Sequence, residues 1–68
     1  MQHYYVNTQE HGNGDHIVHV PRCTHLPEPN QRIYLGTFAD CRDALQAAKS
    51  HFENANGCYW CCSACHTG

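Results

Sequence analysis

Two runs of β-branched and aromatic residues stand near the start of the chain. Tyr4, Tyr5 and Val6 favour a strand over residues 3–6, and His-Ile-Val-His-Val at 16–20 favours a second. Between them, Gly-Asn-Gly-Asp at 12–15 is a turn signal, because glycine and asparagine tolerate positive φ. This pattern predicts a β-hairpin with a long loop.

A third strand is predicted after a proline-rich loop. Pro21 ends the second strand, because proline has no backbone N–H for the ladder. Residues 21–31 contain all three prolines of the chain and are typical of an extended loop. The run Arg-Ile-Tyr-Leu at 32–35 then predicts a short strand, which Gly36 closes.

The clearest element is a helix that begins after Asp40. Asp40 is a good N-cap, and Asp43 three residues later resembles a capping box. The apolar positions fall on one helical face: Cys41, Ala44, Leu45, Ala48 and Phe52. Asn54, Asn56 and Gly57 predict the end of the helix.

The predicted element order is β-β-β-α, followed by a Cys-rich C-terminal turn. It indicates a small α+β fold in which one helix lies on a three-stranded antiparallel sheet. The 68 residues are expected to form a single small domain, 1–68. Tyr59 and Trp60 are expected to form a last edge strand or to cap the core. Cys41, on the apolar helical face, is predicted to be a small buried hydrophobe and not a ligand.

The core that this composition can build is small. Ile, Leu, Val and Phe together number ten, while the chain has six Cys and seven His. A domain of this size buries only about 60% of its unfolded surface. Its core alone supplies no more than roughly 3–5 kcal/mol. A metal ion or disulfides are therefore expected to help hold the fold.

Composition also excludes several classes of protein. Aromatic residues and a net charge of only -2 argue against disorder, and no apolar run approaches the roughly 20 residues of a membrane span. The four basic residues are scattered singly, which argues against nucleic-acid binding. The polar N-terminus has no signal-peptide features. We therefore expect a cytoplasmic protein, whose thiols stay reduced.

The C-terminal tail carries two Cys-x-x-Cys pairs, Cys58/Cys61 and Cys62/Cys65. A tight turn of this kind lets two thiolates converge on one ion. A structural zinc ion takes four such ligands in a tetrahedron, usually from two metal-binding turns (knuckles) that are distant in sequence. The tail is predicted to supply one knuckle.

The second knuckle is expected where the second strand ends. His19 and Cys23 stand four residues apart, and Cys23 with His25 offers another pair. A hydrogen-bonded sheet histidine is the alternative role for His19. In small zinc modules, metal binding contributes roughly 10–16 kcal/mol, more than this core can give. The sequence thus predicts a non-enzymatic module with a structural zinc ion, which presents a surface to a protein partner.

The same stretch carries a spaced set of residues: His19-x3-Cys23, Leu26, Phe38, Ala44, Ala48, Gly57 and Cys62-x2-Cys65. This set resembles the Ada-type metal-binding modules of bacteria, in which the first pair and the terminal Cys-x-x-Cys hold a structural zinc ion. The resemblance implies four zinc ligands: His19, Cys23, Cys62 and Cys65. Cys58 and Cys61 are the alternates for the tail pair.

Four further motifs span nearly the whole chain. They are Tyr-Tyr-Val-Asn, Gly-Asp-His-x-Val-His, Tyr-Leu-Gly-x-Phe and Gly-Cys-x-x-Cys-Cys-x-x-Cys-His. In these motifs the chain resembles a group of short uncharacterised bacterial Cys-rich proteins. That likeness implies no activity.

Other chemistry for the thiols stays open at this point. The six Cys can pair in three disulfides, or the adjacent Cys61 and Cys62 can form a redox-sensing bridge. Cys62-Ser-Ala-Cys65-His66 also matches the attachment motif of c-type haem. Hydrolytic catalysis has no supporting motif, and so short a chain has little room for an enclosed pocket.

Overall fold

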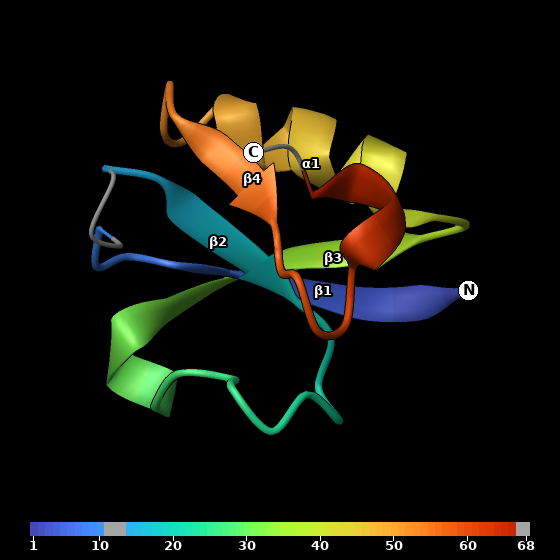
Figure 1. Ribbon diagram of the computed structural model, residues 1–68, viewed down its shortest axis with the longest axis horizontal. Coiled ribbons are helices and arrows are strands. Elements are labelled where there is room, and N and C mark those ends of the chain that lie inside the picture. The colour runs from blue at the N-terminus through green and yellow to red at the C-terminus, as the bar shows by residue number, and fades with distance from the viewer. Residues whose placement is uncertain (11–13, 67–68) are drawn as a thin grey trace.

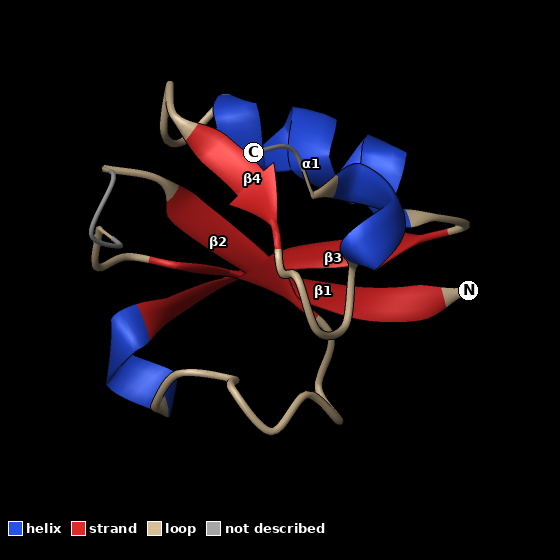
Figure 2. Cartoon of the chain, in the orientation of Figure 1, coloured by secondary structure: helices blue, strands red, loops and turns tan. Residues whose placement is uncertain are grey.

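Across residues 1–10 and 14–66, which the computed structural model describes, four strands form one mixed sheet. The strands are β1 (Gln2–Asn7), β2 (His16–His19), β3 (Arg32–Phe38) and β4 (Ala55–Gly57), in the order β3-β1-β2-β4. β1 pairs antiparallel with β2 and β3, whereas β2 pairs parallel with β4. The helix α1 (Cys41–Lys49) lies against this sheet (Figures 1 and 2).

The predicted α+β class with one helix is confirmed, but the three-stranded antiparallel sheet is wrong. The missed strand, β4, has the sequence Ala-Asn-Gly, which has no strand propensity of its own. It exists because β2 offers it a partner. The His16 N–H donates to the Asn54 carbonyl at 2.8 Å, and the Cys58 N–H donates to the Val18 carbonyl at 3.0 Å.

The third strand does not close at Gly36 as predicted but runs on to Phe38. Tyr4 pairs with Gly36 while Tyr5 pairs with Tyr34, so β3 carries an extra residue at a bulge. Gly36 has φ +119°, which only glycine adopts readily, and this is why it sits at the bulge rather than at a strand end. The predicted turn at 12–15 falls partly outside the described residues.

The N-cap of α1 is as predicted. The Asp40 carboxylate accepts from the N–H groups of Arg42 and Asp43, at 3.0 and 3.2 Å. The helix ends at Lys49, earlier than the apolar pattern indicated, and Ser50 closes it by donating its hydroxyl to the Ala47 carbonyl.

Phe52 therefore lies beyond the helix. Its ring stacks on His16 at 3.8 Å between centroids, and the residue is packed against the core.

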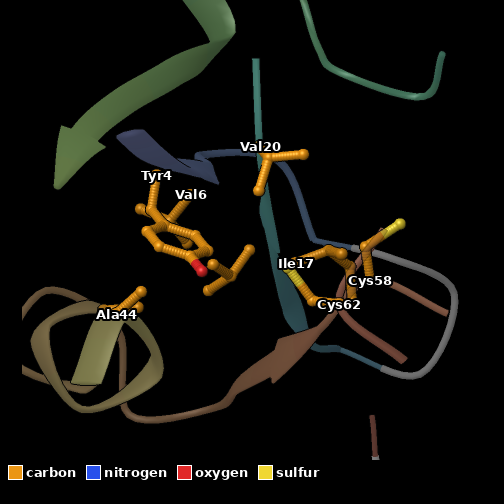
Figure 3. Close-up of a cluster of buried hydrophobic side chains, with 9 residues drawn as sticks. Tyr4, Val6, Ile17, Val20, Ala44, Cys58 and Cys62 are labelled. Atoms are coloured by element: carbon orange, nitrogen blue, oxygen red, sulfur yellow. The ribbon is translucent and has the colours of Figure 1, made fainter. Parts of the chain in front are cut away.

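The core lies between α1 and the sheet and continues into the C-terminal tail. Among the described residues, its buried members are Tyr4, Val6, Ile17, Val18, Val20, Ala44, Ala48, Cys58 and Cys62. Figure 3 labels all of them except Val18 and Ala48. Ala44 and Ala48 are the buried residues of the helix, so α1 approaches the sheet through small side chains. Two of the nine members are cysteines, which agrees with the thin apolar complement of the sequence.

The tail, red in Figure 1, folds back over β4, which is orange. A Cβ on Gly57 would lie only 2.8 Å from the Cys62 carbonyl oxygen, so this close approach requires glycine. A short 3-10 turn, Ser63–Cys65, follows, and Cys65 forms a disulfide with Cys41 at the start of α1. Cys41 is thus an oxidised, half-buried residue, not the free apolar residue that its place in the helical pattern indicated.

Tyr59 and Trp60 form neither an edge strand nor a cap on the core. They are 61% and 68% exposed, in the turn between Cys58 and Cys61. The one helix longer than a single turn in the described part of the chain, α1, is too short and polar to cross a membrane. The cytoplasmic location stays a prediction.

Candidate metal centre

Four metal-binding side chains from two distant segments meet at one end of the sheet. The donor atoms of His19, Cys23, Cys58 and Cys61 all lie within 4.8 Å of one another. Cys23 Sγ is 3.8 Å from Cys58 Sγ, and Cys61 Sγ is 3.9 Å from His19 Nδ1. Around a zinc ion with bonds of about 2.3 Å to sulfur and 2.0 Å to nitrogen, a tetrahedral edge is about 3.8 Å between two sulfurs and about 3.5 Å between sulfur and nitrogen. The Cys23–Cys58 pair is thus already spaced as neighbouring zinc ligands, and Cys61 and His19 are close to that spacing.

The upstream half of the cluster is built at the end of β2. His19 is the last residue of that strand and pairs with Tyr5 of β1, which fixes its direction. Pro21 then excludes further pairing. The Cys23 N–H donates to the Val20 carbonyl at 3.1 Å, a tight turn that returns the thiol of Cys23 to the side of His19.

The downstream half is built at the end of β4. Because β2 and β4 run parallel, both strands end at the same edge of the sheet. The bond from the Cys58 N–H to the Val18 carbonyl extends this pairing by one residue and places Cys58 beside His19. The Cys62 N–H then donates to the Cys58 carbonyl at 2.8 Å, closing the turn that carries Cys61 back to the cluster.

The cluster is shielded from solvent. His19 is 4% and Cys58 3% exposed, while Cys23 and Cys61 are partly buried. Burial raises the pKa of the Cys61 thiol far above its ordinary value; the backbone of Val20 opposes this rise, and the neighbouring thiols reinforce it. Thiolates packed this closely disfavour one another's charge. A divalent cation supplies the positive charge that lets several of them ionise together.

The two ligands predicted upstream, His19 and Cys23, lie together in the cluster. They meet the alternate tail pair, Cys58 and Cys61, rather than Cys62 and Cys65. Cys65 is held in the disulfide to Cys41, so its sulfur is not a free donor. Cys62 is a free thiol, buried in the core, with Sγ 3.9 Å from Cys61 Sγ. The tail pair implied by the Ada-type resemblance, Cys62 and Cys65, thus lies outside the cluster.

Nothing in the sequence distinguishes the two tail pairs, which have identical spacing. The signal that selects Cys58 and Cys61 is the register of β4 on β2, and that register is a tertiary feature. His25, the other upstream candidate, does not join the cluster. It is exposed, and its ring stacks on Trp60 at 5.4 Å between centroids.

The structure differs from the other thiol arrangements that the sequence left open, namely three disulfides, a Cys61–Cys62 bridge and haem attachment. All six cysteines are described, and they form one disulfide and four free thiols rather than three bridges. Cys61 and Cys62 are not bonded to each other. In the haem-like motif, Cys65 is in the disulfide, and His66 Nδ1 lies 3.0 Å from the Gly57 carbonyl oxygen, within hydrogen-bond distance.

Comparison with models of protein families, with curated proteins and with solved structures finds no match. The resemblances to Ada-type modules and to short bacterial Cys-rich proteins stay predictions from the sequence motifs.

Proposed function

We propose that this chain is a small non-enzymatic module, held together by a structural zinc ion, that binds a protein partner. The proposed ligands are His19, Cys23, Cys58 and Cys61. The observation that carries the proposal is the convergence of these four donors from segments 35 residues apart.

The donor set favours zinc in a structural role. Three thiolates and an imidazole are soft and borderline donors that suit a tetrahedral zinc ion, whereas Ca²⁺ and Mg²⁺ take oxygen ligands. Structural zinc sites are closed by four protein ligands, while catalytic sites keep one position for water or substrate. Four protein donors are present here, which supports the structural role.

The energetics support the same role. The core holds few large apolar side chains, and among the described residues the largest fully buried side chains are Val6 and Val18. The segments that bear Cys23 and Cys61 are turns outside the sheet. A zinc ion bound between them would contribute roughly 10–16 kcal/mol. It would tie the end of β2 to the C-terminal tail.

The exposed aromatic pair supports a partner surface. Tyr59 and Trp60 occupy the two positions between the ligands Cys58 and Cys61, and their rings meet edge to face at 4.9 Å. Exposed Trp and Tyr side chains on a rigid support are typical of interface hot spots. Zinc would supply the rigidity by fixing both ends of this turn.

The test is native mass spectrometry of the protein refolded with zinc, for the parent chain and matched alanine variants. We expect one zinc ion per chain for the parent and for Cys62→Ala, and loss of stoichiometric zinc for Cys58→Ala and Cys61→Ala. Zinc lost from Cys62→Ala but retained by Cys61→Ala would contradict the proposed ligand set. A parent chain that binds no stoichiometric zinc would contradict the proposed function.

A second candidate is a thiol-redox-responsive protein, which the Cys41–Cys65 disulfide favours. In that case the bridge would switch between oxidised and reduced states, and zinc would not be needed. Intact mass under non-reducing conditions tests this candidate, because each disulfide lowers the mass by two hydrogens. Oxidant-dependent formation of further bridges in place of zinc binding would support the second candidate over the first.

A further inference from the structure

A cavity of about 280 Å³ lies directly beside the candidate metal centre and shares two of its ligands, His19 and Cys58. Its other walls come from β1, β2 and β4, the turn before β2, the loop that carries His25, the turn between Cys58 and Cys61, and His66 in the tail. The lining residues that bear on its chemistry are Asp15, Asn56, Tyr59 and Trp60. Its volume is just below that of pockets for drug-sized ligands, so it suits one side chain or a similar group.

The charges around this cavity are negative. Among the described residues that line it, Asp15 is the only one with a permanent charge, and no Lys or Arg is present. Three thiolates and a neutral imidazole around a divalent ion leave a net charge of about -1 at the adjoining centre. The chain as a whole also carries a net charge of -2. A cationic ligand is therefore favoured over an anionic one.

The Asp15 carboxylate is held in place by a buried amide. Asn56, only 4% exposed, donates from Nδ2 to Asp15 Oδ2 at 3.3 Å, and its own Oδ1 accepts from the Gly57 N–H at 2.9 Å. This second bond fixes the orientation of the amide and hence of the carboxylate. Each carboxylate oxygen accepts more than one hydrogen bond, so an ammonium group can join the same oxygens.

The aromatic walls suit the same ligand. Trp60 and Tyr59 line the cavity, and His25, which also lines it, stacks on Trp60 with an interplanar angle of 24°. An ammonium ion near the face of a Trp or Tyr ring is attracted by the ring quadrupole. A carboxylate, aromatic rings and a negatively charged centre around one small cavity together define a site for an alkylammonium group.

We propose that this cavity binds the side-chain ammonium of a lysine in a partner protein. The inference rests on the proposed function, since the thiolates around the metal supply part of the negative charge beside the cavity. It specifies the partner surface as basic and places the lysine between Asp15 and the exposed aromatic pair.

The test uses the zinc-loaded full chain and two small probes, Nα-acetyl-lysine methylamide and its norleucine counterpart, which lacks the ammonium. NMR follows the side-chain signals of Trp60 and Asn56. We expect saturable shifts with the lysine probe and none with the norleucine probe. Equal shifts with both probes, or no shifts with either, would overturn the proposal. Butylamine, which carries the same ammonium on the same length of carbon chain, should produce similar shifts, and its failure to do so would also overturn the proposal.

Matched variants locate the site. Asp15→Asn should weaken binding of the lysine probe about tenfold or more, as expected for loss of a charge-assisted hydrogen bond. Trp60→Leu should weaken it up to about fivefold. Glu28→Gln removes the same charge from an exposed residue that does not line the cavity, and should leave the affinity unchanged. Equal losses for Glu28→Gln and Asp15→Asn would overturn the assignment to this cavity.

Zinc content, measured on each sample by native mass spectrometry, separates the two proposals. A protein that binds zinc stoichiometrically but not the lysine probe contradicts this inference alone. A protein that binds no zinc contradicts the proposed function.

Discussion

Removal of the Cys41–Cys65 disulfide separates its contribution to the free energy of unfolding from that of the proposed zinc ion. The bridge joins the start of α1 to the tail across a sequence separation of 24 residues. In the double variant Cys41→Ala/Cys65→Ala the unfolded chain regains the entropy of that loop. For a loop of this length, the variant's free energy of unfolding should be lower than the parent's by about 3.5 kcal/mol.

That magnitude is comparable to the whole contribution expected from so small a core, roughly 3–5 kcal/mol. Without zinc, the double variant should therefore be largely unfolded. With zinc it should stay folded, because the metal contributes roughly 10–16 kcal/mol and none of the four proposed ligands is changed. The zinc-loaded variant should still melt lower than the parent, by roughly 4–8 °C for each kcal/mol lost.

Urea unfolding followed by circular dichroism, with excess zinc and with chelator, measures both cases. The single variant Cys62→Ala, which removes a buried thiol but leaves the bridge and the proposed ligands intact, is the control. Loss of zinc binding in the double variant would refute the reasoning, because it would mean that Cys41 or Cys65 belongs to the metal site. Equal stability of the parent and the double variant in chelator would refute the assigned role of the disulfide.

Three further predictions concern the tail, the thiols and the helix. Gly57→Ala places a Cβ 2.8 Å from the Cys62 carbonyl oxygen and 2.9 Å from Cys65 Cβ, so the tail must shift. We expect weaker zinc binding in a competition titration. An unchanged zinc affinity would contradict this packing. Burial raises the pKa of the Cys61 thiol above its ordinary value of 9.0, so near pH 9.0 this thiol ionises in the unfolded chain but not in the fold. The metal-free fold should therefore lose stability as pH rises through 9.0. A stability that rises in urea titrations over this range would contradict the burial of Cys61. Zinc affinity should instead fall as pH falls, since protons compete for the thiolates. Asp40→Ala removes the acceptor of two helix N–H groups and should cost about 1 kcal/mol in thermal unfolding, with no change in zinc content.

Local signals in the sequence predicted much of the fold. The β-branched runs gave the central strands β1 and β2, and Asp40 marked the start of the helix, because these features depend on residues close together in the chain. β4 was missed, since Ala-Asn-Gly becomes a strand only by pairing with β2 across about 40 residues of chain. The Cys41–Cys65 bridge was missed because Cys41 also fits the apolar face of α1.

For the candidate site, the sequence predicted the residue types and the two contributing segments. It placed one half at the end of β2, where His19 precedes Pro21 and Cys23 follows it in a turn. It could not choose between Cys58/Cys61 and Cys62/Cys65, because the two pairs have the same spacing. Only the parallel register, which sets Cys58 beside His19, distinguishes them.

X-ray absorption at the zinc edge of the zinc-loaded protein tests the proposed metal centre most directly. Coordination by His19, Cys23, Cys58 and Cys61 predicts one zinc ion per chain, with three sulfur neighbours at about 2.3 Å and one nitrogen at about 2.0 Å. A fourth sulfur, a shell dominated by oxygen, or no stoichiometric zinc at all would contradict it.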